Sequence, residues 1–415
     1  MSREMKDSGI AWIGEIPKGW KVGKVKHFYQ FITGFTPDTK KDYYYDENGI
    51  PWVTISDLSG KFIEETKMGI SQKYIELNNP IIVPQNSLLY SFKLSVGQVA
   101  RTKFELYTNE AIASFLHNDN ISLDYLYYSS QICIIQNANE NIYGAKLLNQ
   151  NLISNAIIIF PPLPEQQKIA EFLDRKCGEI DELVALQEKM IEELKAYKQS
   201  VITEAVTKGL NPNAPMKDSG IEWIGEIPKG WIRAKYRYSG VFTKGKLPNE
   251  QNIECLGKPI IGASEMLGKE CRNFSLDTNV PTCQKQDVLI LWDGANAGIV
   301  ANNCDGIVSS TVVKYECTDE NFDSQFLFYL FKNGEHFFKS KVNGTTIPHM
   351  NQKYIDEYLC IQPPLPEQQA IADYLDKKCA EIDELVAVKQ QKIETLKEYK
   401  KSLIYEYVTG KKEVI

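Results

Sequence analysis

The sequence predicts an α/β (α+β) protein in which two mixed α/β domains are joined by two long helices that form an antiparallel coiled coil. Three observations support this prediction. The heptapeptide PPLPEQQ occurs twice, 202 positions apart, at Pro161–Gln167 and Pro363–Gln369. A 16-residue motif also occurs twice, at Met5–Trp20 and Met216–Trp231, with 15 of its 16 residues identical. Each heptapeptide opens a long segment of helical periodicity, so the chain is an internal repeat with expected pseudo-two-fold symmetry.

The overall composition is that of a globular protein. The chain has 415 residues, 43% apolar and 24% charged, and this length favours two or three domains. No apolar run reaches the roughly 18 residues of a membrane span, and the first residues lack the hydrophobic core of a signal peptide. The nine cysteines and four histidines show no metal-ligand spacing. We therefore expect a cytoplasmic protein with reduced thiols, no metal site and no membrane association.

The segments that follow the heptapeptides are predicted to be long helices. Residues 161–207 and 363–409 share 31 of 47 aligned residues. Pro164 and Pro366 suit a first helical position, and the glutamate after each is favoured there by the helix dipole. A helix of this length spans about 67 Å at 1.5 Å per residue, and its apolar stripe requires a partner, which we expect to be the other copy. The predicted seam is formed by Leu173, Ile180, Leu183, Leu194, Leu375, Ile382, Leu385 and Leu396.

Two further features of these helices are shared by both copies. A polar residue interrupts the apolar stripe at the same place, Gln187 in one copy and Lys389 in the other. Such a residue either fixes the register of the pair or marks where the stripe drifts toward solvent. The sequence EIDEL is identical at Glu179–Leu183 and Glu381–Leu385. Its identity is explained equally by one partner that docks twice and by a recent duplication.

Between the repeated segments lie two regions that have diverged. Residues 22–160 and 232–362 share only short fragments, such as VGQVA and AGIVA. Short β-branched runs alternate with turn sequences, which predicts strands, and a pure β domain is the alternative. Helices are expected at Ser122–Gln136 and Phe322–Phe338. The predicted division is residues 1–160 and 212–362 for the two domains, and 161–211 and 363–415 for the helices with their flanking segments.

No segment carries a complete catalytic motif. GVFTKGKL ends in Leu247, where a phosphate-binding loop needs Ser or Thr. Asp38 with Glu65 and Lys67 matches the carboxylate pattern of metal-dependent nucleases, but the second half has no counterpart. The glycines that end SFKLSVG and WDGANAG predict tight turns rather than a dinucleotide site. The Asn-Pro-Pro-aromatic motif of amino-methyltransferases is absent, and no motif forms a convincing catalytic constellation.

This arrangement resembles the specificity subunit of type I restriction-modification systems. The resemblance covers essentially the whole chain and rests on WIGEIPKGW before each variable region, on PPLPEQQ and EIDEL after it, and on the duplication. It implies two target recognition domains that each read one half of a bipartite, asymmetric double-stranded DNA site, with the helices setting the gap. It also implies two methyltransferase subunits that bring S-adenosylmethionine, and restriction subunits that use ATP and Mg²⁺. The specificity subunit itself would be non-catalytic and would bind no cofactor.

The charge distribution limits how such a chain can bind DNA. The net charge is −7 and both variable regions are close to neutral, so the chain alone should bind DNA weakly. We expect contacts from basic, amide and aromatic side chains in loops, although each alone also fits a solvated loop residue. The first-domain candidates are Lys40, Lys41, Tyr43, Tyr44, Lys93, Arg101, Asn139, Tyr143 and Lys146. The second-domain candidates are Lys244, Lys246, Arg272, Asn273, Asn296, Lys341, Asn343, Thr345, Thr346 and His349.

Two alternative functions remain open at this level, and one of them is a nuclease in its own right, which would rest on the carboxylate pattern within Pro37–Lys67. A duplicated coiled-coil adaptor without a DNA role would share the same repeats. It predicts similar surfaces on the two variable domains, whereas their sequences differ.

Overall fold

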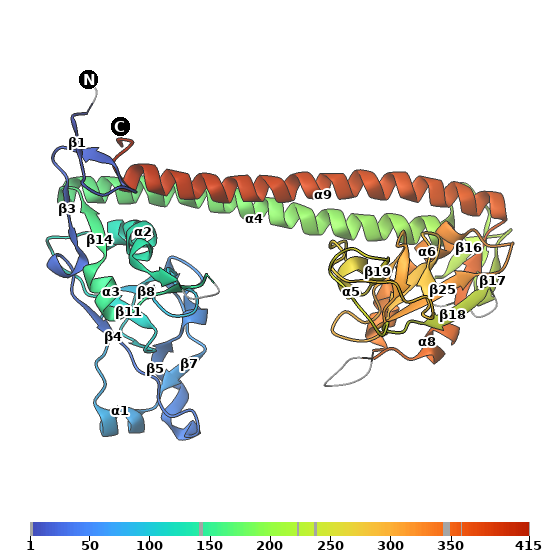
Figure 1. The fold of residues 1–415 in the computed structure, drawn as a ribbon, viewed down its shortest axis with the longest axis horizontal. Helices are drawn as coiled ribbons and strands as arrows, with labels where there is room; N and C mark the ends of the chain where they lie inside the picture. The colour runs from blue at the N-terminus through green and yellow to red at the C-terminus, as the bar shows by residue number, and fades with distance from the viewer. Residues whose placement is uncertain are drawn as a thin grey trace. The chain divides into compact units, whose positions relative to one another are not determined.

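A computed structural model shows that the chain folds into two compact units. It describes residues 3–140, 144–221, 224–235, 239–342, 349–357 and 359–414. One unit comprises Met1–Gln187 and Gln391–Ile415, and the other comprises Glu188–Gln390. Each unit therefore contains one variable domain and one half of each long helix (Figure 1).

The first unit is a mixed α/β domain. Its helices are α1 (Gln72–Asn78), α2 (Leu123–Cys133) and α3 (Gln150–Asn155), with 3₁₀ turns η1 (Val25–His27), η2 (Asp42–Tyr44), η3 (Ile55–Asp57) and η4 (Ile134–Asn137). Its strands are β1 (Met5–Asp7), β2 (Glu15–Pro17), β3 (Lys21–Lys24), β4 (Phe31–Thr33), β5 (Tyr45–Val53), β6 (Phe62–Ile63), β7 (Met68–Ile70), β8 (Leu88–Ser91), β9 (Val99–Thr102), β10 (Tyr107–Thr108), β11 (Ile112–Phe115), β12 (Asn139–Glu140), β13 (Lys146–Leu147) and β14 (Ile157–Phe160).

The second unit repeats this plan. Its short helices are α5 (Ala263–Met266), α6 (Ser324–Asn333), α7 (Glu335–Ser340) and α8 (Gln352–Glu357). Its strands are β15 (Met216–Asp218), β16 (Glu226–Pro228), β17 (Ile232–Lys235), β18 (Gly240–Lys244), β19 (Lys258–Ile261), β20 (Phe274–Ser275), β21 (Thr282–Cys283), β22 (Val288–Leu291), β23 (Val300–Ala301), β24 (Gly306–Val308), β25 (Val312–Cys317) and β26 (Leu359–Gln362).

The central sheets of the two units share the order of four strands, and the first sheet has β6 as a fifth strand at its edge. The first has the order β4-β11-β8-β9-β6 and the second β18-β25-β22-β23. In each, the strand after the central β8 or β22 pairs antiparallel with it, and the main helix, α2 or α6, packs against this strand pair. Buried side chains of the sheet, of this helix and of the long helices form one core in each unit. The mixed α/β prediction is confirmed, and the pure β alternative is wrong.

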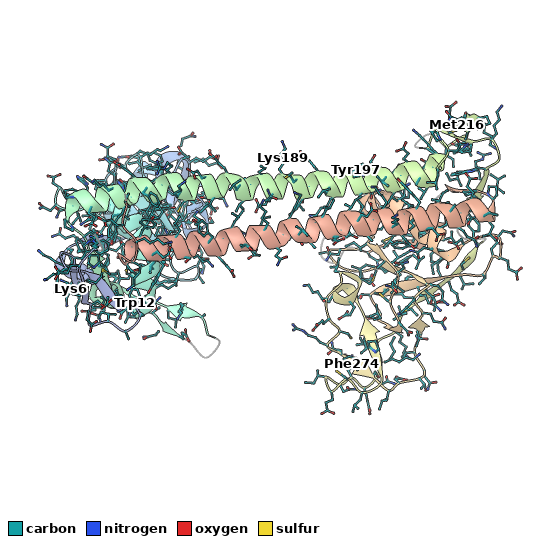
Figure 2. All side chains as sticks on the ribbon, turned by 90° about the horizontal axis from the view of Figure 1, so that it is seen from above. Lys6, Trp12, Lys189, Tyr197, Met216 and Phe274 are labelled. Carbon is teal, nitrogen blue, oxygen red and sulfur yellow. The ribbon has the colours of Figure 1, made fainter. Side chains whose placement is uncertain are left out.

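The two long helices are α4 (Leu163–Lys208) and α9 (Leu365–Val408). They begin within the heptapeptides, as the proline positions predict. In the first unit Lys400 donates to Asp181 at 2.7 Å, and in the second Lys198 donates to Asp383 at 2.6 Å. These pairs join the end of one helix to the start of the other, so the helices run antiparallel within each unit, as predicted. Figure 2 shows Lys189 and Tyr197 along the α4 half that belongs to the second unit.

Six of the eight predicted seam residues are buried or partly buried, as a seam position requires. Leu183 and Leu385 are wrong, because their exposed fractions are 44% and 51%. Residues of a seam are spaced alternately by three and four positions along the helix. The residue after Ile180 in the seam lies four positions later, so it is the partly buried Val184 and not the predicted Leu183. Gln187 is buried, as expected for a polar residue of the seam. The buried or partly buried members are Leu173, Ile180, Leu194, Leu375, Ile382 and Leu396.

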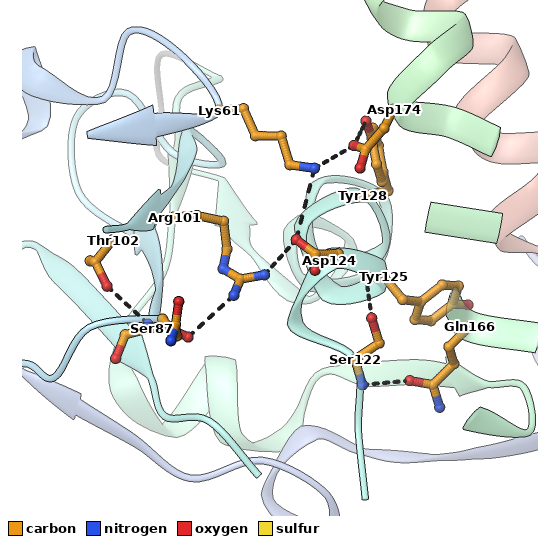
Figure 3. Close-up of polar contacts among 11 residues, drawn as sticks. Lys61, Ser87, Arg101, Thr102, Ser122, Asp124, Tyr125, Tyr128, Gln166 and Asp174 are labelled. Carbon is orange, nitrogen blue, oxygen red and sulfur yellow. Dashed lines mark hydrogen bonds and ion pairs between the residues drawn. The ribbon is translucent and has the colours of Figure 1, made fainter. Parts of the chain in front are cut away.

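The heptapeptide joins each long helix to the main helix of its domain. Gln166 accepts a hydrogen bond from the N–H of Ser122, which caps α2, at 3.0 Å (Figure 3). Its amide also donates to the carbonyl of Pro161 at 2.9 Å. Gln368 likewise accepts from the N–H of Asp323, the cap of α6, at 2.9 Å. The repeat therefore marks a buried polar joint between domain and helix.

The 16-residue motif is tied to the same joint. The indole N–H of Trp20 donates to Glu165 at 2.8 Å, and that of Trp231 donates to Glu367 at 2.9 Å. Both tryptophans end their motif and are almost fully buried, and both glutamates lie in the first turn of a long helix. The two repeated sequences recur together because they contact each other.

Three further features of the described residues concern their helices, their cysteines and their potential metal ligands. None of the helices among them is long and apolar enough to cross a bilayer. Eight of the nine cysteines have described side chains, and these eight are free thiols. No cluster of three or more His, Cys, Asp or Glu side chains placed to hold a metal occurs within it.

Candidate nucleic-acid interface

Equivalent strand ends carry polar side chains in both domains. Because β4 and β18 have the same register against their neighbours, Thr33 occupies the position of Lys244. Because β8 and β22 also share their register, Lys93 occupies the position of Asp293. The register pairs are Thr33 with Ala113, Ser91 with Ile112, Lys244 with Val313 and Leu291 with Val312.

The turn after β8 or β22 closes in the same way in both domains, although the second turn is one residue longer. Gly97 and Gly298 both adopt φ 93°, a conformation that favours glycine. The N–H of Gly97 donates to Ser91 at 3.0 Å, and that of Gly298 donates to Leu291 at 2.7 Å. The predicted tight turns are confirmed, and they hold Lys93 and Asn296 in exposed loops.

In the first domain the strand ends present a charged cluster. The hydroxyl of Thr36 donates to Glu110, and this hydrogen bond lowers the pKa of the Glu110 carboxyl. Lys93, which is exposed, adds a smaller electrostatic contribution in the same direction. Gln150 donates to the Thr33 hydroxyl at 2.9 Å. Lys93 is therefore available as a donor at the rim of the sheet.

A second group of predicted residues lies at the far end of the first domain. Lys41 contacts the ring of Tyr44, with its ammonium nitrogen 5.2 Å from the ring centroid, and their hydrogen bond raises the Lys41 pKa. Tyr43 packs edge-on against Tyr44 and is half exposed. Lys73 lies 4.2 Å from the Tyr43 ring centroid, and Tyr74 packs on Tyr44. Figure 1 shows α1, which carries Lys73 and Tyr74, at the end of the domain away from α4.

Basic and aromatic side chains are thus interleaved on η2 and α1. Such an arrangement suits a phosphate backbone and an exposed base or sugar face. Lys40 lies exposed at the same turn, where its N–H donates to Asp38 at 3.1 Å. The structure therefore brings four predicted residues, Lys40, Lys41, Tyr43 and Tyr44, into one patch.

In the second domain the strand ends converge on one carboxylate. Lys244 donates to Asp293 at 3.3 Å, and a ring nitrogen of His349 contacts the other carboxylate oxygen. A backbone bridge also joins Asp293 and His349, and the His349 ring packs edge-on near Trp292. The structure thus brings the predicted Lys244 and His349 together around an acidic residue that the sequence analysis did not select.

The other second-domain candidates are more dispersed. Lys246 and Asn296 are exposed in the loops after β18 and β22. Lys341 is partly buried, 5.5 Å from the ring centroid of Phe337. Arg272 and Asn273 precede β20, whose Phe274 lies at the end of the domain away from the helices (Figure 2).

Arg101 is a structural residue, and its assignment to the interface is wrong. Its exposed fraction is 8%, and its guanidinium donates to Asp124 of α2 at 2.6 Å (Figure 3). Lys61 joins this network at 3.8 Å from Asp124 and also contacts Asp174 of α4. The network ties the sheet through α2 to the long helix, and it holds the Arg101 guanidinium in the interior of the domain.

Two further first-domain candidates lie on a small hairpin. Asn139 of β12 is exposed, and Lys146 of β13 is paired with Glu140. The predicted residues Tyr143, Asn343, Thr345 and Thr346 lie outside the described residues.

The structure adds residues that sequence reasoning missed. Lys73 and Tyr74 lie beside the predicted tyrosines, and their KY dipeptide in a short helix was a usable signal. Asp293 was not predicted because basic, amide and aromatic side chains were expected to contact DNA. Its position in WDG, directly after a predicted strand, was a usable signal. Thr36 and Glu110, which are 74 residues apart, gave no local signal.

Comparison with known proteins identifies the family. The family model described as type I restriction modification DNA specificity domain matches residues 17–196 and again residues 228–398. The chain belongs to this type I DNA specificity family. The two matches together cover most of the chain and correspond to its two halves.

Two relatives and one solved structure match this chain over nearly its full length. The type I restriction enzyme MjaVIII specificity subunit of Methanocaldococcus jannaschii is 25% identical over 95% of this chain and 93% of its own length. The MjaIX specificity subunit of the same organism is 24% identical over 97% and 95%. A chain from a study of complex assembly and conformational transition of the type I R-M system has a TM-score of 0.71 at 16% identity, covering 95% of this chain and 98% of its own. This last likeness supports the fold.

Proposed function

We propose that this chain is the DNA-recognition subunit of a type I restriction-modification enzyme. Each variable domain reads one half of a bipartite, asymmetric duplex site. The observation that carries this proposal is the presence of two DNA specificity domains on one repeated frame, with different side chains at equivalent strand ends. Two readers on one frame are expected when two different sequences have to be recognised.

The chemistry is assigned to partner subunits. Two methyltransferase subunits bring S-adenosylmethionine, and restriction subunits bring ATP and Mg²⁺ chemistry. This chain directs them to the site and holds no cofactor of its own. The near-neutral charge of both variable regions supports shared DNA binding, because phosphate contacts from partner subunits would then supply much of the affinity.

The long helices connect the two readers. The antiparallel pairing within each unit and the buried heptapeptide joints fix each domain to its helix pair. In the proposed function these helices determine the number of unread base pairs between the half-sites, and a change in their length changes that number.

Methylation mapping tests the proposal. The chain is co-expressed with its methyltransferase subunit, and modified adenines in the host DNA are located by sequencing. A two-part motif with a fixed gap is expected. When residues 22–160 are exchanged for those of another family member, only one half of the motif should change. If an intact assembled complex produces no new methylation, the recognition role is refuted.

A further inference from the structure

The two domains carry opposite charges at one equivalent position. Lys93 and Asp293 each lie two residues after a central strand of shared register. Each follows a buried aromatic residue, Phe92 or Trp292. The N–H of this aromatic residue donates to the residue before β11 or β25, at 2.9 and 2.8 Å respectively. The strand and the aromatic residue after it therefore have equivalent backbone contacts in both domains, and the next side chain is reversed in charge, although the loop that follows is one residue longer in the second domain.

The carboxylate of Asp293 is paired with two side chains but can still accept further hydrogen bonds. Its side chain is 20% exposed, and Lys244 and His349 flank it with 51% and 54% of their own side chains exposed. A carboxylate offers about four acceptor positions, and these two donors occupy two of them. The flanking donors reduce the repulsion that a bare carboxylate would meet near phosphate, and acceptor capacity remains for a third donor.

The same place in the first domain offers donors instead. Lys93 is exposed beside the Thr36–Glu110 pair. Thr33 occupies the position of Lys244. In sequence, Leu147 corresponds to His349, because each lies two residues before the repeated Asn-Gln pair. The first domain thus lacks both residues that flank the carboxylate in the second.

We propose that this position reads bases of opposite hydrogen-bond polarity in the two half-sites, an inference that rests on the proposed function. Lys93 donates to an acceptor in the major groove, such as O6 or N7 of guanine. Asp293 accepts from an exocyclic amino group of cytosine or adenine. Lys244 and His349 are positioning residues that orient the carboxylate and offset its charge. The position is a specificity determinant in each domain.

The substitution Asp293→Asn tests the second domain in the assembled complex. An amide can rotate to present either a donor or an acceptor, so preference for an amino-bearing base should fall roughly 5- to 150-fold at one position of one half-site. Methylation sequencing measures this preference site by site. Lys93→Met should relax one position of the other half-site only. The matched control is Glu320→Gln, an exposed acidic residue at the turn before α6, and it should leave both half-sites unchanged.

Two further results separate base reading from a structural tie. Asp293→Glu keeps a carboxylate, so it should keep the preference for an amino-bearing base even where total methylation falls. A uniform fall for Asp293→Asn at all sites, with every base preference intact, would overturn the inference. Relaxed preference in Asp293→Glu equal to that in Asp293→Asn would overturn it as well. Absence of any bipartite motif with the unmodified chain would instead refute the proposed function.

Discussion

Two neighbouring glutamines show how differently identical residues act within the heptapeptide. Gln166 is 1% exposed, and both ends of its amide are bonded to backbone groups. Gln167 is exposed at the surface of α4. The second heptapeptide repeats this division, because Gln368 is fully buried and Gln369 is exposed. The buried glutamine determines how the domain and the helix are joined. Its two backbone partners are shielded from water, so water cannot replace the hydrogen bonds that the glutamine makes.

Replacing the buried glutamine should weaken the first unit. Gln166→Ala leaves the N–H of Ser122 and the carbonyl of Pro161 without a partner, so the free energy of unfolding should fall by about 2–4 kcal/mol. Urea unfolding of the full chain, followed by the fluorescence of tryptophans including Trp20 of that unit, measures the change. Gln167→Ala is the matched control and should stay within about 0.5 kcal/mol. Equal losses in both variants would contradict the assigned role of Gln166.

Sequence reasoning at this scale finds local partners better than distant ones. The repeated letters located the heptapeptide, but not which of its glutamines is buried. Arg101 was assigned to DNA because arginine is a common base reader, yet its partner Asp124 lies 23 residues away on another element. Asp293 gained its meaning only when folding placed Lys244 and His349 beside it, 49 and 56 residues distant in sequence.

Among the elements, the long helices were predicted well in extent and less well in phase. Proline positions and an uninterrupted helical period define where α4 and α9 begin. The seam phase failed because leucine was favoured over smaller apolar residues at stripe positions. The structure instead places Cys177 and Val184 between Leu173, Ile180 and Gln187. Side-chain size is a weak guide where the partner helix decides which face is covered.

A pair of leucines on α9 tests this seam. Leu375 is fully buried in the core of the second unit, whereas Leu385 is 51% exposed. Leu375→Ala should lower the free energy of unfolding by about 2–5 kcal/mol, because it removes buried methyl groups and leaves a cavity. Leu385→Ala is the control, and it should cost less than about 0.5 kcal/mol.

Urea unfolding and amide hydrogen exchange in the second unit measure both effects. A large loss of unfolding free energy for Leu385→Ala would show instead that Leu385 belongs to the seam.

At the scale of the whole molecule, a common frame supports divergent surfaces. The Trp–Glu and Gln–cap contacts are the same in both units, while the strand ends differ in charge. The adaptor alternative predicts similar surfaces on the two variable domains, and Lys93 against Asp293 shows the opposite. Repeats therefore predicted the frame from sequence alone. The reading surfaces required the strand register, because only the register aligns loops whose sequences have diverged.

The charge of the whole chain leads to the last prediction. With a net charge of −7, the chain alone should bind a duplex carrying its site with a Kd no tighter than about 10⁻⁶ M at physiological salt. The complex with methyltransferase subunits should reach the range of about 10⁻⁸ to 10⁻¹¹ M that is typical of specific recognition. Fluorescence anisotropy over a salt series measures both, with a duplex of scrambled half-sites as the control. The complex should also show a steeper fall of affinity with salt, because each added phosphate contact releases counterions. Nanomolar, site-selective binding by the chain alone would show that its own patches suffice and would contradict the shared-contact argument.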